Sequence, residues 1–222
     1  MVQRVLEVGR LLGWRRVIEL GPRWLVHREF LVFSRDLTVP LPAHPSPPDL
    51  RWADLTEEDW PKLTRAHPMM GEREIRRRTN EQQRCLVGWV DDAVVYYQWD
   101  TMQPIFLTYL GRPFRPAPGE CFADAAGTSP LWRSRGLGTV GLLQSFHRAR
   151  VLGCRRATGL VAWFNEPSIR IARRLNRVLE GRVGYWGAGA LRHYYTRAHV
   201  RFESGSLVVP SPMPWTEPER SL

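Results

Sequence analysis

The sequence predicts a mixed α+β fold, and three observations lead to this prediction. The 222 residues are 43% hydrophobic and 24% charged, a balance typical of a globular protein that buries a sizeable core. The middle of the chain carries a clear hairpin pattern, with two apolar stretches joined by Asp91-Asp92. The second half alternates apolar strands with two stretches of helical periodicity, which indicates strand–helix–strand units.

An extension is expected in front of the main domain. Residues 2–12 carry apolar side chains near helical spacing, and apolar stretches within residues 16–34 flank the turn signal Gly21-Pro22. The next segment, residues 39–49, is proline-rich and predicts an extended linker. We therefore expect residues 1–38 to form a helix plus hairpin that packs on the main domain, because this piece is too small to stand alone.

The main domain is predicted over residues 50–203, and the Pro- and Ser-rich tail, residues 204–222, is expected to be loose. The first half of the main domain is predicted to begin with a strand at 50–53 and a helix from Thr56, with Asp59 at the capping-box position. A helix at 72–82 and a hairpin at 84–90 and 93–99 follow. The last elements of this half are a strand at 105–110, a Pro- and Arg-rich loop at 111–119 and a strand at 121–128. Its second half is predicted to contain a helix at 137–152, a strand at 157–164, a helix at 167–178 and strands at 183–186 and 190–196.

The chain is strongly basic, with a formal net charge of +10, and Lys62 is its single lysine. A basic surface favours anionic partners, so coenzyme A, an acidic carrier protein, anionic lipid and nucleic acid are all candidates. The three cysteines lie far apart and the histidines never cluster with acids or cysteines, so we expect no disulfide framework and no metal. The sequence shows no apolar run that could span a bilayer and no secretory signal, which predicts a cytoplasmic protein.

The most informative segment is Ser129–Leu143, a strand end followed by a glycine-containing loop and the start of a helix. The first turn of a helix leaves backbone N–H groups without partners, and these donors together with the helix dipole suit a phosphate or diphosphate. Gly136 and Gly138 let the backbone approach an anion closely, and Arg133 and Arg135 add charge-assisted hydrogen bonds. On these grounds the segment is a candidate anion cradle.

The same segment resembles the coenzyme A-binding motif of the GNAT (GCN5-related N-acetyltransferase) superfamily, written R/Q-x-x-G-x-G/A. Arg133, Gly136 and Gly138 fill its three defining positions, and Pro-Leu-Trp precedes them. The run Asn165-Glu166-Pro167-Ser168 resembles the family's next motif, in which an Asn closes the following strand. The order of elements over residues 50–199 also matches, so the resemblance implies a central, mostly antiparallel twisted sheet flanked by helices.

The resemblance implies an N-acyltransferase that moves an acetyl or longer acyl group from acyl-coenzyme A directly to an amine. It implies that N–H groups of residues 135–139 bind the diphosphate, that the end of the strand before them pairs with the pantetheine arm, and that arginines of residues 170–174 lie nearby. The implied coenzyme-binding residues are Ala126, Thr128, Ser129, Arg133, Ser134, Arg135, Gly136, Leu137, Gly138, Thr139, Asn165 and Ser168.

The chemistry also predicts a base. An amine attacks only when its nitrogen is deprotonated, so a nearby carboxylate, acting directly or through water, is expected. Asp124 is the first candidate because it lies on the strand before the cradle, and Glu120 is the second.

Two departures from the family pattern are visible. Family members commonly use a tyrosine in the helix after the Asn motif to protonate the leaving thiolate, but Ala172 stands at that position. Tyr185, Tyr194, Tyr195 or water could replace it. The family often has Gly-Phe after this helix, where this chain has Asn176-Arg177, and Asn tolerates the left-handed conformation that the glycine would adopt.

Other readings stay open. The extension, the apolar stretch 105–110 and the many tryptophans could line a channel for a long acyl chain, with an acidic acyl-carrier protein as donor. Arg73 with Arg76–Arg78 could bind nucleic acid, but no nucleic-acid-binding signature supports this. The basic amphipathic start, residues 2–16, could lie on a membrane surface. A homodimer is also open, and the sequence does not specify the acceptor amine.

Overall fold

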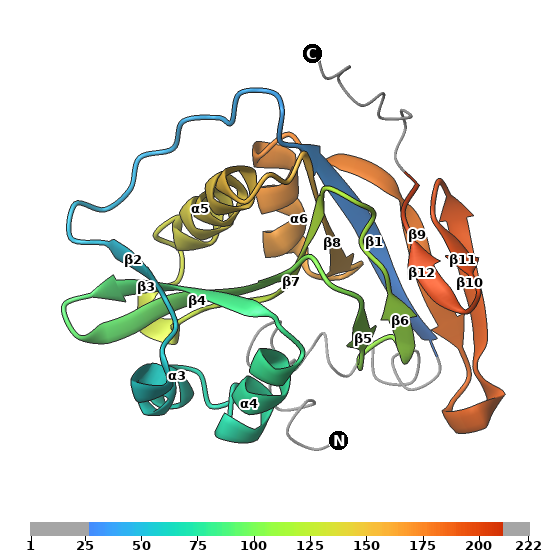
Figure 1. The fold of residues 1–222 in the computed structure, drawn as a ribbon, viewed down its shortest axis with the longest axis horizontal. Coiled ribbons are helices and arrows are strands. Elements are labelled where there is room, and N and C mark those ends of the chain that lie inside the picture. Colours follow the sequence, from blue (N-terminus) through green and yellow to red (C-terminus); the bar gives the residue numbers. More distant parts are fainter. Residues whose placement is uncertain (1–26, 211–222) are drawn as a thin grey trace, which may run out of the picture.

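The computed structural model describes residues 27–210, which form a large mixed sheet of eight strands (Figure 1). The strands follow the order β10-β9-β1-β8-β7-β4-β3-β2 across the sheet. Their bounds are β1 His27–Asp36, β2 Arg51–Asp54, β3 Arg84–Val90, β4 Ala93–Thr101, β7 Glu120–Thr128, β8 Arg156–Ala162, β9 Val178–Trp186 and β10 His193–Ala198. The helix predicted at residues 2–12 and the first hairpin arm lie outside the described residues.

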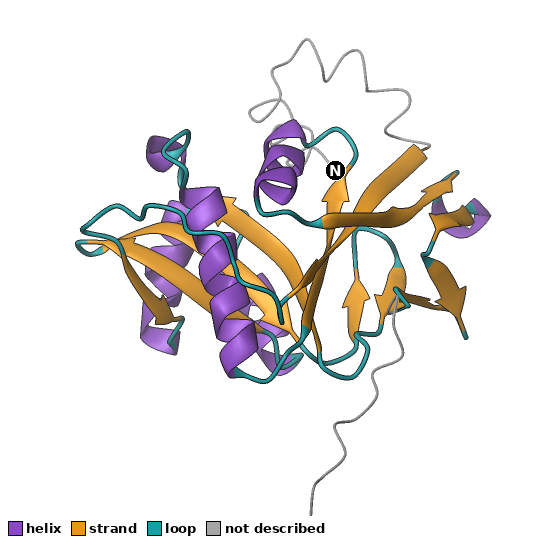
Figure 2. Ribbon diagram, turned by 90° about the horizontal axis from the view of Figure 1, so that it is seen from above, coloured by secondary structure: helices purple, strands orange, loops and turns teal. Residues whose placement is uncertain are grey.

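Helices cover both faces of the large sheet, and Figure 2 shows the same layers from above. Tyr96 of β4 packs with Leu137 on one face, whereas its neighbour Tyr97 packs with Leu63 and Ile75 on the other. Successive side chains of a strand point to opposite faces, so one strand serves two separate cores. The helices are α5 (Leu137–Val151) and α6 (Glu166–Arg174) on the first face, and α3 (Trp60–Ala66) and α4 (Glu72–Asn80) on the second; short 3₁₀ turns are η1 (Glu57–Asp59), η2 (Pro130–Trp132) and η3 (Gly189–Leu191).

A second sheet of four strands packs on the face opposite α5 and α6. Its order is β11-β12-β6-β5, and the ring of Phe114 lies 4.2 Å, centroid to centroid, from that of Phe122 on β7. Two expectations are corrected here: the predicted loop 111–119 contains β6, and the predicted loose tail contains β12, whose Leu207 is fully buried. The bounds are β5 Ile105–Leu107, β6 Arg112–Phe114, β11 Arg201–Glu203 and β12 Ser206–Val208.

The strand β1 corrects the expected domain boundary. It pairs antiparallel with β8 on one side and with β9 on the other, so it lies inside the large sheet instead of in an outer extension. Val32 at its centre is fully buried. Residues 27–36 therefore belong to the main domain, because removing them would leave both neighbouring strands with an open edge.

The predicted capping box at Thr56 does not form. The Thr56 hydroxyl donates to the Asp59 carboxylate at 2.8 Å, and no side chain caps the backbone at either helix start. A 3₁₀ turn replaces the first turn, and α3 begins only at Trp60. The pattern therefore located the helical segment but not its cap geometry.

The two strands at the centre of the sheet diverge along their length. β7 and β8 run parallel, whereas the other neighbouring pairs of the large sheet run antiparallel. They pair only from Glu120↔Arg156 to Phe122↔Thr158, although β7 continues to Thr128 and β8 to Ala162. Each strand stays paired with its outer neighbour over this length. The facing edges of β7 and β8 thus open like a V toward the start of α5.

Candidate active site

The loop between β7 and α5 has alternating backbone handedness. Arg133 has a φ of −65°, Ser134 of 62° and Gly136 of 79°, and Arg135 between them has no positive φ. Successive residues with opposite φ signs turn their N–H groups toward one concave side, which is the geometry of an anion-binding nest. His44 of the linker borders this nest, 3.5 Å from where a Cβ on Gly136 would stand.

The N–H groups that open α5 have no acceptor within residues 27–210. Gly136 is the N-cap residue, no side chain caps the helix, and its carbonyl accepts from Thr139 (2.9 Å) and Val140 (3.2 Å). The N–H groups of residues 134–138 donate no hydrogen bond within the described part of the chain. The expected donor range of 135–139 is corrected in this respect, because the Thr139 N–H is already used by the Gly136 carbonyl. These donors stand at the positive end of the helix dipole, so the loop is free to accept a diphosphate.

The α6 helix approaches the cradle closely. A Cβ on Gly138 would stand 2.8 Å from the Ile171 Cδ1 atom, so a larger residue there would require the end of the Ile171 side chain to shift. The Arg174 Nη1 atom lies 3.4 Å from the Thr139 Oγ1 atom on the first turn of α5. The expectation that the basic side of this helix lies near the cradle therefore fits Arg174.

Two further arginines flank the cradle and are exposed. Arg133 donates weakly from its Nε atom to the Thr128 carbonyl at 3.5 Å, and the Arg135 guanidinium lies 4.7 Å from the Trp132 ring centroid. Neither is paired with a carboxylate among the described residues. Both therefore remain free to turn toward an anion.

A β-bulge lies in β7 where the V opens. Asp100 of β4 pairs with Ala123, but Gln98, two residues before it, pairs with Ala126, so β7 carries one extra residue. A bulge leaves a residue outside the ladder and redirects side chains, and bulges are common beside active sites. The extra residue falls at 124–125, so a local distortion of the strand sets the direction of the Asp124 side chain.

The end of β7 offers its free edge to the V. Ala126 and Thr128 pair with β4, and the Ser129 N–H donates to the Val95 carbonyl at 2.9 Å. The opposite edge of these three residues has no strand partner, because the pairing with β8 stops at Phe122. An extended amide-containing ligand could hydrogen-bond to this edge as an added strand would.

Asp124 is buried and fully engaged on the α4 face of the sheet. Its Oδ2 atom accepts from Arg78 Nη1 at 2.6 Å, and its Oδ1 atom accepts from the Tyr109 hydroxyl at 3.0 Å. Burial and the neighbouring Asp124 carboxylate raise the pKa of Tyr109 well above its usual value. Tyr109 thus keeps its proton. Sequence reasoning did not connect it with the candidate base Asp124, because its stretch reads as a plain apolar strand.

The structure does not bring the other two catalytic candidates to the cradle. Glu120 lies at the far end of β7, where it accepts from the Ala117 N–H at 2.9 Å, and four residues of strand, about 13 Å, separate it from Asp124. Tyr185 lies on β9, three strands from β7, with its ring 5.5 Å from that of Tyr194. Glu120 and Tyr185 therefore lie away from the opening between β7 and β8.

His67 is a buried titratable residue that sequence reasoning did not single out. It ends α3, its ring meets the Tyr97 ring edge-on at 4.7 Å, and its buried Nε2 atom has no partner among the described residues. Burial, and secondarily the charge of Arg133, lower its pKa from 6.5 to about 4, so the imidazole is neutral at physiological pH. A lone histidine just after a helix gives no sequence signal that its ring will be buried.

Residues of the second motif have local structural roles. The Asn165 side chain accepts from the Ser168 N–H at 3.3 Å and so caps α6. Ala172 is buried in the core between α6 and the sheet. Asn176 has a φ of 51°, as expected for a residue replacing the family glycine. Arg177 then enters the core, donating to the Phe33 carbonyl at 2.8 Å.

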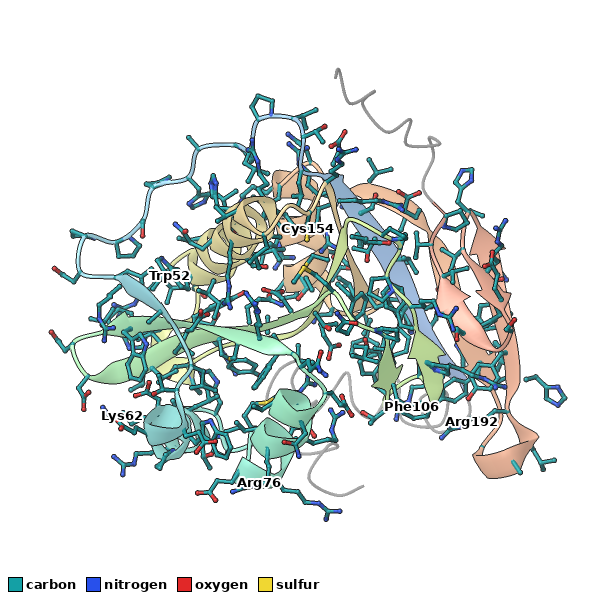
Figure 3. All side chains as sticks on the ribbon, in the orientation of Figure 1. Trp52, Lys62, Arg76, Phe106, Cys154 and Arg192 are labelled. Carbon is teal, nitrogen blue, oxygen red and sulfur yellow. The ribbon has the colours of Figure 1, made fainter. Side chains whose placement is uncertain are left out.

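The described cysteines are buried and free of disulfides, and Cys154 lies in the core beneath α5 (Figure 3). Within residues 27–210, no group of three metal-binding side chains is arranged to hold an ion. The helices of this part of the chain are all too short or too polar to cross a bilayer.

No protein-family model and no curated protein matches the chain. Solved structures do match it. A GCN5-related N-acetyltransferase from Sphaerobacter thermophilus aligns with a TM-score of 0.53 at 16% identity, over 77% of this chain and 55% of that one. A protein described as a GNAT-family acetyltransferase, from Novosphingobium aromaticivorans, aligns with a TM-score of 0.53 at 17% identity, over 71% and 62%. A conserved protein of unknown function from Staphylococcus epidermidis aligns with a TM-score of 0.52 at 9% identity, over 78% and 65%.

This chain thus spans little more than half the length of the Sphaerobacter enzyme, and all three identities are low enough that the likeness concerns the fold alone. The mixed sheet, the diverging central strands and the glycine loop before α5 agree with that likeness. The described chain has the fold of the GNAT acetyltransferase superfamily.

Proposed function

We propose that this chain is an N-acyltransferase that takes an acyl group from acyl-coenzyme A and passes it directly to an amine. The observation that carries this proposal is the nest at residues 134–138, whose N–H groups have no acceptor within the described chain. A diphosphate is the ligand that this geometry suits best, because it accepts several hydrogen bonds and carries negative charge.

The coenzyme would be held along the V. The N–H groups of residues 134–138 hold the diphosphate, with Arg133, Arg135 and Arg174 supplying charge around it. The free edge of Ala126–Ser129 is the part of the chain that can hydrogen-bond to the amides of the pantetheine arm. Asn165 and Ser168 contribute to coenzyme binding indirectly, because their hydrogen bond fixes the start of α6 beside the cradle.

Bound acyl-coenzyme A supplies a thioester carbonyl that is already activated toward an amine. The chain must then accept a proton from the amine, and Asp124 is the proposed acceptor. Its carboxylate stands at the β7 bulge, held by Arg78 on one oxygen and by Tyr109 on the other. Glu120 and Tyr185 take no part in this proposal, since their strand positions keep them away.

Tyr109 holds the second oxygen of this carboxylate. Its hydroxyl stays protonated and donates to the Asp124 Oδ1 atom, so it fixes the carboxylate in place and stabilises its charge. The proton lost by the amine goes to Asp124, and a proton from water neutralises the departing thiolate of coenzyme A.

The cradle is tested by placing a negative side chain in it. Gly136→Glu should abolish binding of coenzyme A in isothermal titration calorimetry, because it adds bulk and repulsion where the diphosphate would lie. Gly153→Glu is a matched control: Gly153 ends the same helix, has a similar φ of 83° against 79°, and has open space around it. Unchanged coenzyme A affinity in a folded Gly136→Glu protein would falsify the proposal.

The acyl donor and the role of Tyr109 are tested by separate measurements. Thermal-shift titrations with acetyl-coenzyme A, a long-chain acyl-coenzyme A and an acyl-carrier protein rank the donors, since a ligand raises the melting temperature according to its affinity. Release of free thiol from the best donor, measured with a panel of polyamines, amino acids and peptides, identifies the acceptor class. Tyr109→Phe should lower kcat while leaving coenzyme A affinity unchanged, because it removes the hydroxyl that hydrogen-bonds to Asp124 and leaves the ring in place.

A further inference from the structure

A cavity of about 170 Å³ opens at the other end of α5, away from the cradle. Its lining includes Asp100 and Thr101 of β4, Ser145 and Arg148 of α5, and Arg84 of β3. Arg148 is eleven residues beyond Leu137, which places it about 16 Å along the helix from the cradle. The cavity is therefore separate from the proposed coenzyme site.

Two buried polar atoms of residues that line this cavity lack partners among the described residues. Asp100 is 7% exposed; its Oδ2 atom accepts from the Ser145 hydroxyl at 2.9 Å, but its buried Oδ1 atom has no hydrogen bond within residues 27–210. The Nη1 atom of Arg148 is also buried and without a partner, while its Nη2 atom pairs with Asp54 at 2.5 Å. Buried polar atoms are nearly always hydrogen-bonded, because leaving one unpaired is costly.

The two unpaired atoms are complementary in charge but are not bonded to each other. One is a carboxylate oxygen, which accepts, and the other is a guanidinium N–H, which donates. Arg84 adds a second positive group, since it lies directly across from Asp100 in the β3–β4 ladder. A cation alone would satisfy only Asp100, and an anion alone only the arginines. A small molecule with one positive and one negative end satisfies both.

Size and wall chemistry narrow the ligand further. A cavity of about 150 Å³ holds a molecule the size of benzene, so this one accommodates about six or seven non-hydrogen atoms. Ala149, Leu152 and Met102 give it an apolar side, and the latter two are exposed at its mouth. A short apolar or hydroxylated side chain fits against that wall.

We propose that this cavity is a second ligand site, which binds a small α-amino acid with its ammonium on the Asp100 carboxylate and its carboxylate on the guanidinium groups of Arg148 and Arg84. The site is independent of the acyl-transfer proposal, because none of its residues belongs to the cradle or to the Asp124 network. Its geometry requires both ends of the zwitterion.

The test uses the full chain and calorimetric titration with glycine, L-alanine and L-serine at about pH 8, above the pKa of about 7 that burial gives Asp100, so that this carboxyl group is ionised. Methylammonium chloride, sodium acetate and glycerol, at matched ionic strength, present each end or a neutral polar group alone. We expect saturable binding of at least one amino acid and at least about tenfold weaker binding of each single-function probe, since a charged hydrogen bond is lost. No saturation by any amino acid up to about 100 mM, or equal binding of acetate or glycerol, overturns the proposal.

Variants separate the two ends. Asp100→Asn keeps the shape but removes the charge, and Arg84→Gln removes the exposed cation; each should weaken the amino acid about tenfold or more. Arg150→Gln, on the exposed side of the same helix, is the control and should change nothing. Because Arg84 is exposed, its variant remains informative even if Asp100→Asn unfolds. Undiminished affinity in a folded Asp100→Asn or Arg84→Gln protein counts against the site, and binding should persist in Gly136→Glu.

Discussion

Arg78 of α4 and Asp124 of β7 form a buried ion pair, with 2.6 Å between the Arg78 Nη1 and Asp124 Oδ2 atoms and side chains that are each 6% exposed. The pair joins a helix to the bulge of the strand that borders the V. The same contact therefore stabilises the fold and orients the carboxylate of Asp124, the proposed proton acceptor.

Removing one partner of this pair should be strongly destabilising. Arg78→Met leaves the Asp124 carboxylate buried without its counter-charge, and we expect the free energy of unfolding to fall by about 3–5 kcal/mol. The double variant Arg78→Met, Asp124→Leu should recover much of that loss while remaining inactive. Urea unfolding of the three proteins provides the measurement; a single variant that costs less than about 1 kcal/mol would contradict a buried, uncompensated charge.

Gly141 of α5 is required by the Tyr96 ring. A Cβ at position 141 would stand 2.2 Å from the Tyr96 Cε1 atom, far inside contact distance. Alanine improves intrinsic helix propensity by about 1 kcal/mol, but overpacking costs about 1–3 kcal/mol, so Gly141→Ala should be destabilising overall. Thermal unfolding measures the effect. Adding Tyr96→Leu should restore part of the lost stability, and a Gly141→Ala protein more stable than the parent would show that the helix and sheet are not packed this closely.

The carboxyl group of Asp100 should make stability fall as pH rises. Burial is the main cause that raises its pKa from 3.8 to about 7, partly offset by the Ser145 hydrogen bond and the Arg148 charge. Between about pH 4 and 7 the unfolded chain ionises this group while the folded chain keeps it protonated, so up to about 4 kcal/mol is lost over this window. The stability difference between the parent and Asp100→Asn, measured by urea unfolding from pH 4 to 8, should show this slope. A pH-independent difference would mean that the group titrates normally.

His67 should make stability fall as pH falls, which is opposite to the effect of Asp100. Its folded pKa of about 4 lies below the usual 6.5, so the unfolded chain takes up a proton first as pH falls. The stabilisation is complete above about pH 6.5 and is lost as pH falls toward 4, by about 3 kcal/mol. His67→Gln should flatten this limb of the pH–stability curve without affecting the Asp100 limb. An NMR titration that places the His67 pKa above 6 would sink the prediction.

Asn165 should prove to be a capping residue. Its side chain accepts from the Ser168 N–H, so Asn165→Ala should cost about 1 kcal/mol of stability. Asn165→Asp preserves the acceptor and should restore stability. Coenzyme A affinity should fall only slightly in Asn165→Ala, in contrast to Gly136→Glu. A large loss of affinity at unchanged stability would instead assign Asn165 to direct coenzyme contact.

Local signals in the sequence located much of the fold. The hairpin at Asp91-Asp92, the glycine loop before α5 and the left-handed Asn176 all depend on a few neighbouring residues, whose conformational preferences are strong. The N–H groups of the cradle were predictable for the same reason, since every helix start leaves such groups free. The choice of Asp124 also followed from its place on the strand before that loop.

Tertiary structure decided the rest. Tyr109 and Arg78 meet Asp124 only because the second sheet and α4 pack on one face of β7, and no pattern within a short window encodes that meeting. The insertion of β1 between β8 and β9 joins residues more than a hundred positions apart, as does the burial of Leu207 in the predicted loose tail. The sequence by itself therefore determined much of the order of helices and strands along the chain and the glycine loop before α5, which rest on local backbone geometry. The contacts of Arg78 and Tyr109 with Asp124, the order of the strands across the sheet and the second cavity depend on long-range register, which only the packed sheet fixes.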